Sequence, residues 1–260
     1  PMIESTAQVI SGNSGGALIN DEGKVVGITV SSHSGGVPSY SVPIRYLNSL
    51  IGDGETVYFD HYYYQVGSGN TSDAEFATNN SILGTMDSYT YTLYTQNYFR
   101  GLPVLLKERG YETAAMHAYE KTFWNRENMY PSLGFDHFFN SDYYEEDEDY
   151  TGWSVVSVND ENFYSQSVEA MKTLSEPFYS FMITLSGHHP YQQKEEDCHI
   201  RLRPSEEGTT VGDYLNTVRY VDEALEQFFE ELKESGLYEN SIICIYGDHY
   251  GLSCTLRPFA

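Results

Sequence analysis

The chain beyond residue 70 alternates stretches of helical periodicity with short apolar runs, and this order constrains the fold more than any other feature. Helices are expected over residues 71–83, 98–109, 159–174 and 211–235. Strands are expected at residues 113–117, 178–185 and 241–246. Buried strands separated by helices are typical of a mostly parallel sheet with helices on both faces. The sequence therefore predicts an α/β fold over most of the chain.

The first 51 residues have a different pattern, that of a small β-rich segment. Short strands are expected at 7–10, 17–20, 24–30 and 40–43, followed by a helical start at 44–50. Around Gly52–Glu55 the composition changes from Ser, Gly and Val to Tyr, Asn and Asp. We therefore predict two domains, residues 1–54 and 55–260.

Charge and cysteine content exclude several classes of function. The 260 residues include 38 Asp and Glu but only 14 Lys and Arg, so a net charge of −24 repels polyanions and argues against a nucleic-acid partner. Three cysteines without a CxxC pair do not make a zinc site or a disulfide framework. No apolar run approaches the roughly 20 residues that cross a bilayer, so no membrane anchor is expected in this chain.

Ser14 lies in a glycine-rich turn, Gly12-Asn13-Ser14-Gly15-Gly16. Glycines allow a tight turn that exposes the hydroxyl while backbone amides face a developing oxyanion. Residues 1–51 resemble the C-terminal end of an HtrA-type, trypsin-like serine protease. That family has its triad His and Asp earlier in the chain, whereas 13 residues precede Ser14 here and His33 matches a loop position. We expect Ser14 to be an inactive protease-like nucleophile, because a Ser without a general base is weak.

Thr71 follows the glycine-rich stretch Gly67-Ser68-Gly69-Asn70 and begins a predicted helix. Unpaired amides and the positive end of the helix dipole favour an anion there, either an ionised alkoxide or a bound phosphate. The same pattern is also typical of an N-capping Thr with acidic residues in the first helical turn. From the residues alone, Thr71 is a candidate for either role.

Asp248 and His249 follow the apolar run 241–246, at the predicted carboxyl end of a strand, where open α/β sheets bind ligands. A carboxylate, an imidazole and the Thr71 alkoxide would suit Mn²⁺ or a similar divalent cation. Such a metal would lower the pKa of the Thr hydroxyl and offset charge on a transferring phosphoryl group. Thr71, Asp248 and His249 are therefore the predicted metal ligands.

Residues 57–254 resemble the extracellular catalytic domain of lipoteichoic acid synthases, which are sulfatase-like phosphoglycerol transferases of the alkaline phosphatase superfamily. The matching stretches are 59–76, 111–139, 177–191 and 241–251. The resemblance implies a sheet sandwiched by helices and a ping-pong reaction. Metal-bound Thr71 attacks phosphatidylglycerol, diacylglycerol leaves, and glycerol phosphate passes from Thr71 to the polyglycerolphosphate chain. Mn²⁺ is the implied cofactor, with Mg²⁺ as the alternative.

The same resemblance implies four substrate-binding residues, of which three lie between 117 and 126. They are His117, Trp124, Arg126 and His188. A guanidinium suits the phosphate, an indole face suits the glycerol, and imidazoles suit hydrogen bonding or proton transfer. The implied location is the extracellular face of the membrane, or the secreted fraction, of a Gram-positive type of bacterium, with contact to the membrane surface through the lipid substrate.

The family's first strand, with a Glu that completes the metal shell, has no match in this sequence. Loss of one anionic ligand weakens binding of a divalent cation. We therefore expect low or no turnover from this chain.

Three alternative functions remain open. The first is a sulfatase or phosphodiesterase of the same fold. The second is an HtrA-like serine endopeptidase that uses Ser14. The third is a non-catalytic fragment that holds a polyol phosphate through Trp124 and Arg126.

Overall fold

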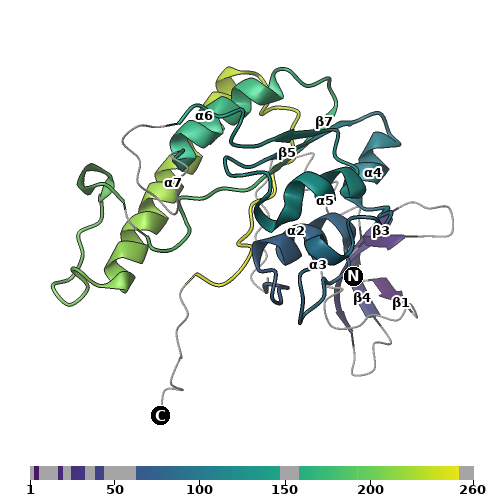
Figure 1. Ribbon diagram of the computed structural model, residues 1–260, viewed down its shortest axis with the longest axis horizontal. Helices are drawn as coiled ribbons and strands as arrows, with labels where there is room; N and C mark the ends of the chain where they lie inside the picture. The colour runs from purple at the N-terminus through teal and green to yellow at the C-terminus, as the bar shows by residue number, and fades with distance from the viewer. Residues whose placement is uncertain are drawn as a thin grey trace, which may run out of the picture. The chain divides into compact units, whose positions relative to one another are not determined.

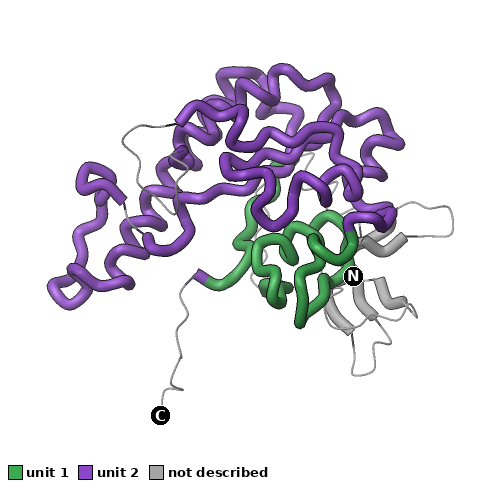
Figure 2. Tube along the Cα trace, in the orientation of Figure 1, with its two compact units in different colours: residues 1–94, 242–250 green, residues 95–241, 251–260 purple. Residues whose placement is uncertain are grey.

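The computed structural model describes residues 63–146, 158–191 and 193–251, together with four strands near the N-terminus (Figure 1). The chain divides into two compact units (Figure 2). The first comprises residues 1–94 and 242–250, and the second comprises residues 95–241 and 251–260. The predicted boundary at residue 54 lies outside the described residues, so the division into 1–54 and 55–260 stays a prediction.

The four N-terminal strands form an antiparallel sheet in the order β1-β4-β3-β2. Their bounds are β1 (Ile3–Ser5), β2 (Ala17–Ile19), β3 (Val25–Ser32) and β4 (Ser39–Pro43). In the register of this sheet, Ile28 of β3 is opposite Ala17 on one side and Val42 on the other. The strands predicted at 17–20, 24–30 and 40–43 are confirmed. Those predicted at 7–10, and the helix at 44–50, lie outside the described residues.

The first unit also contains two helices, α2 (Thr71–Asn80) and α3 (Thr90–Leu93). Ala74 and Phe76 of α2 are buried. This helix ends earlier than the predicted 71–83, because Ser81 adopts the left-handed conformation with φ of 55° and donates its backbone N–H to Ala77 O.

The second unit is built on a parallel sheet of three strands in the order β6-β5-β7. The bounds are β5 (Glu112–Met116), β6 (His137–Phe139) and β7 (Phe178–Met182). Ala115 of β5 pairs with Phe138 of β6 and Phe181 of β7. The centre of the sheet is Ala114–Met116, which is fully buried and lies within the short strand predicted at 113–117. The prediction of a parallel sheet is therefore confirmed.

Four helices accompany this sheet: α4 (Leu102–Lys107), α5 (Arg126–Leu133), α6 (Asp160–Met171) and α7 (Thr210–Glu234). Two single 3₁₀ turns, η1 (Phe123–Asn125) and η2 (Glu195–Asp197), lie between them. The long helices α6 and α7 run side by side (Figure 1). The rings of Tyr164 and Phe228 stack between them, with 4.6 Å between their centroids. Both helices begin within one residue of the predicted start, because Asn159 and Thr209 accept hydrogen bonds from backbone amides of the first turn.

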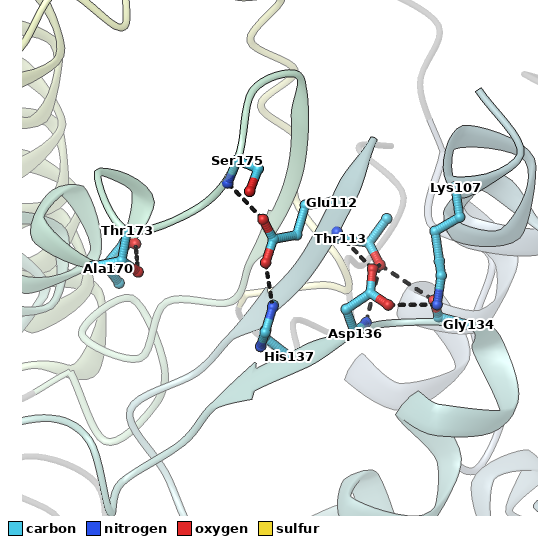
Figure 3. A network of polar contacts seen from close by, with 9 residues as sticks. All are labelled: Lys107, Glu112, Thr113, Gly134, Asp136, His137, Ala170, Thr173 and Ser175. Atoms are coloured by element: carbon cyan, nitrogen blue, oxygen red, sulfur yellow. Dashed lines mark hydrogen bonds and ion pairs between the residues drawn. The ribbon is translucent and has the colours of Figure 1, made fainter. Parts of the chain in front are cut away.

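A polar network fixes the amino ends of β5 and β6 (Figure 3). Asp136, just before β6, accepts hydrogen bonds from Thr113 N and Thr113 Oγ1 and forms an ion pair with Lys107 of α4. Burial acts to raise the pKa of Asp136, but the bonds from Lys107 and Thr113 outweigh it and the pKa is lowered. The network therefore sets the register of the two strands from the end opposite to their carboxyl edge.

The strand predicted at residues 241–246 is wrong. The structure gives this run no regular secondary structure, and Ile242 and Ile245 are 67% and 62% exposed. An apolar run becomes a strand only when a neighbouring strand satisfies its backbone, and no described strand pairs with this one.

No helix within the described ranges is both long enough and apolar enough to span a membrane.

Candidate active site

Thr71 is the first residue of α2 and is half-buried. Asn70, directly before it, has φ of 43° and ψ of −113°, a conformation that costs a residue with a side chain of the order of 1–3 kcal/mol. Asn70 makes no side-chain cap, but its carbonyl oxygen accepts bonds from the amides of Asp73 and Ala74, both at 3.1 Å. The chain thus turns sharply just before Thr71 and enters the helix at once.

The amides around this turn differ from the expectation of unpaired donors. Gly67 N and Gly69 N both donate to Asp73 Oδ2, at 3.0 and 2.8 Å, and Ser72 N donates to Gly69 O at 3.0 Å. The amides of Gly67 and Gly69 are therefore occupied by the Asp73 carboxylate, and that of Ser72 by a backbone carbonyl. The expectation of unpaired amides is corrected for these three residues, and the anion role of Thr71 stays a prediction.

Asp248 and His249 belong to the same compact unit as Thr71. His249 N donates to Asp248 Oδ1 at 2.9 Å, and His249 Nε2 lies 3.7 Å from Asp248 Oδ2. His249 Nδ1 lies 2.9 Å from Tyr250 O, so the tautomer that donates this bond has its lone pair on Nε2. The Tyr250 ring in turn packs edge-on against Tyr64, with 5.7 Å between centroids.

This donor set fits a divalent cation in its chemistry. A carboxylate oxygen and an imidazole nitrogen face each other, and the nitrogen is oriented by a backbone carbonyl, as in many metal-binding histidines. Among the described residues, no group of three or more His, Cys, Asp and Glu side chains is gathered for a metal. Thr71, which lies in the same compact unit as Asp248 and His249, stays the predicted third ligand.

His117 lies at the carboxyl end of β5, in the second unit, and is 2% exposed. Its Nδ1 is 2.9 Å from Ile183 O, directly after β7, so this contact joins the carboxyl ends of two neighbouring strands. Burial, and then the charge of Arg126, hold the pKa of His117 well below its ordinary value. His117 is therefore neutral at pH 7, with Nδ1–H donating to Ile183 O and Nε2 available as an acceptor.

Trp124 and Arg126 follow in η1 and at the start of α5. Trp124 and Asn125 both have positive φ, 55° and 58°, and consecutive left-handed residues with side chains are a mark of a functionally constrained segment. Arg126 is 1% exposed; its Nη1 donates to Phe123 O at 3.4 Å, and its guanidinium lies 5.9 Å from the centre of the Phe123 ring. A buried guanidinium of fixed orientation is well suited to a phosphate.

His188 follows β7 and is half-buried. Its Nδ1 lies 2.9 Å from His189 O, and the two imidazole rings are 4.2 Å apart. The loop before it is held by Asp160, the first residue of α6, whose Oδ1 accepts bonds from Leu185 N at 3.0 Å and Ser186 N at 2.9 Å. All four predicted substrate-binding residues therefore lie in the second unit, in segments that follow β5 or β7.

The predicted site thus falls into two sets. Thr71, Asp248 and His249 share the first unit, and His117, Trp124, Arg126 and His188 share the second. Ser14 lies outside the described residues, so its role stays a prediction, as does the HtrA-type resemblance of residues 1–51.

A model of the sulfatase family matches residues 25–254. The chain belongs to the sulfatase family. Among curated relatives, lipoteichoic acid synthase 1 of Bacillus subtilis is 41% identical over 212 residues, which cover 80% of this chain and 32% of the relative. Lipoteichoic acid synthase of Staphylococcus aureus is 39% identical over 212 residues, with the same coverage. This sulfatase-family chain therefore spans about a third of the length of these relatives.

Solved structures agree with the family assignment. The crystal structure of the lipoteichoic acid synthase LtaP from Listeria monocytogenes superimposes with a TM-score of 0.65 and 28% identity, covering 74% of this chain and 46% of that chain. A protein in the alkaline phosphatase superfamily from Vibrio parahaemolyticus superimposes with a TM-score of 0.55 and 26% identity, covering 67% of this chain and 41% of that chain. The expected α/β class, a parallel sheet flanked by helices in a sulfatase-like or alkaline phosphatase-like fold, is confirmed.

Two residues of this site were missed by sequence reasoning. Asp73 and Asp160 each lie at a helix start, where an acidic residue is ordinarily explained by the helix dipole. The sequence signal that could have found them is the apolar or glycine residues next to each aspartate. A carboxylate in such surroundings has to accept hydrogen bonds from backbone amides.

Proposed function

We propose that this sulfatase-family chain catalyses metal-dependent transfer of glycerol phosphate from phosphatidylglycerol to a growing lipoteichoic acid chain, through a covalent intermediate on Thr71. One observation carries the proposal. The candidate nucleophile and both candidate metal ligands lie in one compact unit of a chain that is 41% identical to a lipoteichoic acid synthase.

In the first half-reaction, the Thr71 oxygen attacks the phosphorus of phosphatidylglycerol as its hydroxyl proton is removed. The bond from phosphorus to the diacylglycerol oxygen breaks, and diacylglycerol leaves with a proton. Thr71, Asp248 and His249 would hold the cation, Mn²⁺ or Mg²⁺, which when bound favours the alkoxide form of Thr71 and offsets phosphate charge. The helix dipole of α2 adds to this, because Thr71 is at its amino end.

In the second half-reaction, the terminal hydroxyl of the polyglycerolphosphate chain attacks the same phosphorus. The Thr71 oxygen leaves and regains a proton, so the enzyme returns to its starting state. Arg126 binds the phosphate oxygens, Trp124 contacts the glycerol, and His188 hydrogen-bonds to it. Neutral His117 accepts a hydrogen bond at Nε2 from a glycerol hydroxyl, which a protonated imidazole would not do.

The lipid donor places this reaction at a membrane surface, and the polymer that it extends places it on the extracellular face of a Gram-positive type of cell, or in its secreted fraction.

The deciding experiment detects the covalent intermediate rather than turnover, so that a slow enzyme is still observed. The chain is incubated with phosphatidylglycerol vesicles and Mn²⁺, without polymer acceptor, and then digested and analysed by mass spectrometry. We expect one glycerophosphate adduct on the peptide that contains Thr71. Thr71→Ala should abolish it, whereas Thr78→Ala, an exposed threonine of the same helix, should not change it.

Absence of the adduct, or an equal adduct in Thr71→Ala, contradicts the proposal. Release of glycerol phosphate into water without transfer favours a phosphodiesterase, and cleavage of an aryl sulfate favours a sulfatase. Labelling of Ser14 by a fluorophosphonate favours the endopeptidase. Binding of glycerol phosphate that depends on Arg126, without any adduct, favours the non-catalytic fragment.

A further inference from the structure

One buried carboxylate, that of Asp73, holds the turn before Thr71 in place. Asp73 is 1% exposed, and its Oδ2 accepts hydrogen bonds from Gly67 N at 3.0 Å and Gly69 N at 2.8 Å. These two amides flank Ser68, so a single oxygen closes the whole turn between residues 67 and 70. The turn owes its shape to Asp73 as well as to its glycines.

The other oxygen of Asp73 reaches a separate segment of the chain. Thr90 Oγ1 donates to Asp73 Oδ1 at 3.1 Å and accepts a bond from Thr85 N at 2.8 Å. Thr90 is the first residue of α3 and is 1% exposed. The carboxylate therefore joins three pieces: the turn, the helix that begins with Thr71, and the loop that leads into α3.

Two glycines lie close to the Asp73 carboxylate. A Cβ on Gly69 would lie 2.5 Å from Asp73 Oδ1. A Cβ on Gly84 would lie 2.8 Å from the same oxygen and 2.5 Å from Thr90 Oγ1. Both glycines are thus required by close approach to the Asp73–Thr90 pair, in addition to any freedom of their backbones.

The backbone just before Thr71 is strained, and strain of this kind persists only where neighbouring contacts determine the conformation. Asn70, with φ of 43°, lies between Gly69, whose amide bonds to Asp73 Oδ2, and Thr71. Its carbonyl oxygen is itself bonded to Asp73 N at 3.1 Å. The side chain and the backbone of Asp73 therefore hold both sides of the strained residue.

We infer that Asp73, supported by Thr90, is a positioning residue that fixes the Thr71 hydroxyl for attack. The inference rests on the proposed function, because it assumes that Thr71 is the nucleophile. Asp73 acts through the turn and not through the substrate, since its two oxygens bind Gly67, Gly69 and Thr90. Misplacement of a nucleophile by about 1 Å slows a reaction by about 100-fold, so a rigid turn contributes to rate and not to donor binding.

The turn also differs from glycine-rich loops that cradle a phosphate. In those loops the backbone amides bind the ligand. Here Asp73 occupies two of the amides, and it fills the place that such an anion would take. Other groups therefore bind the negative charge of the substrate, and the role of the turn is to orient Thr71.

The test perturbs Asp73 from the side away from Thr71. Thr90→Val keeps the shape of the side chain but removes the donor to Asp73 Oδ1, and Thr90→Ser restores the hydroxyl. Thr92→Val, an exposed threonine in the same helix, is the matched control. The rate constant for adduct formation on Thr71 is measured per folded molecule over a range of phosphatidylglycerol concentrations. Amide hydrogen exchange at Gly67 and Gly69 is measured in parallel.

We expect Thr90→Val to lower the limiting rate constant by about 10- to 100-fold, with an unchanged donor concentration at half-saturation and faster exchange at both amides. Thr90→Ser should recover most of the rate, and Thr92→Val should match the wild type. If Thr90→Val does not fold, Asp73→Asn, which replaces the charge-assisted bonds to the two amides with weaker neutral ones, is used with the same expectation.

Two outcomes overturn different claims. No adduct on wild-type Thr71 overturns the proposed function, and the positioning role falls with it. An adduct that forms equally fast in the wild type and in Thr90→Val, or one whose loss appears only as weaker donor binding, overturns the positioning role alone. An unchanged exchange rate at Gly67 and Gly69 in Thr90→Val also overturns it.

Discussion

Two buried aspartates hold functional loops in the two compact units, and they differ in how completely they are satisfied. Asp73 binds Gly67 N and Gly69 N with one oxygen and Thr90 Oγ1 with the other. Asp160 binds Leu185 N and Ser186 N with one oxygen, while its buried Oδ2 has no hydrogen-bond partner among the described residues. The same residue type, in the first turn of a helix in both cases, is therefore used in two electrostatic settings.

The two aspartates differ in the hydrogen bonding of one oxygen atom, Oδ2 of Asp160. In Asp160, burial raises the pKa, and the bonds from Leu185 and Ser186 only partly oppose it. Ser186 Oγ also accepts a bond from Asp160 N, so the two residues hold each other. A carboxylate with both oxygens satisfied tolerates burial, whereas one with a bare oxygen is drawn towards its protonated form. The loop before His188 is consequently sensitive to pH through Asp160.

Truncation of each aspartate is the strongest way to break the comparison. Asp73→Ala removes the acceptor of two backbone amides and of the Thr90 hydroxyl, and we expect it to destabilise the 67–90 region by about 3 kcal/mol or more. Asp160→Ala removes fewer bonds together with an unfavourable buried oxygen, and should cost about half as much in the 183–188 region. Hydrogen exchange with peptide resolution measures each region separately. Equal costs would contradict the comparison.

Metal binding is expected to act on one region only. Mn²⁺ at about 100 times its Kd should stabilise the unit that contains Thr71, Asp248 and His249 by about 2.7 kcal/mol, because it binds the native state. The amides of Leu185 and Ser186 in the other unit should show no change. Asp248→Ala should abolish the effect in hydrogen exchange and in thermal unfolding, whereas the exposed Asp87→Ala should keep it. Protection that survives in Asp248→Ala would show that the metal binds elsewhere.

A pH series tests the bare oxygen of Asp160 more finely. Because the folded pKa of Asp160 is raised, the native state binds its proton more tightly than the unfolded state does. The stability of the wild type relative to Asp160→Asn is therefore greatest below the ordinary carboxyl pKa of about 4, falls as pH rises towards the raised pKa, and is constant above it. The change is about 1.4 kcal/mol for each unit of pKa difference, measured by exchange of the 183–188 amides from pH 4 to pH 8. If the stability of the wild type and that of Asp160→Asn change in parallel over this pH range, the prediction is contradicted.

The smallest expected effect is that His117 does not titrate near neutral pH. Its pKa is lowered by burial and by Arg126, so its ring resonances should not shift between pH 8 and pH 6. His199, whose pKa is raised by its bond to Glu223, should titrate above its ordinary value in the same spectra. Since His117 is neutral when folded and protonates when unfolded, its contribution to stability is present above about pH 6.5 and is lost as pH falls. A His117 that titrates with His199 would remove the acceptor role proposed for Nε2.

The periodicity of the sequence was sufficient for the central strands and the long helices. Ala114–Met116 and the 25-residue helix α7 follow from apolar patterns that have one interpretation each. The run 241–246 has the same apolar character, but a strand depends on a partner elsewhere in the chain, and periodicity does not report partners. This is why a correct pattern led to a wrong strand.

Chemical types were predictable at the site, but the geometry was not. The residue identities of Trp124 and Arg126 suggested a phosphate and polyol site, yet nothing local indicates that Trp124 and Asn125 are left-handed or that Arg126 is buried. The partners of Asp73 lie up to 17 residues away along the chain, so its role depends on a tertiary contact. Sequence reasoning therefore predicted which residues the site contains, and the fold determines what holds them in place.

In concentrated solution, the run Ser241–Tyr246 makes the chain prone to self-association. It has three isoleucines, no charge and no proline, and Ile242 and Ile245 are 67% and 62% exposed. Short uncharged segments of high β propensity can stack with copies of themselves as strands. The segment that precedes the candidate metal ligands is thus also the one that limits the concentration and the time for which a purified sample stays monomeric.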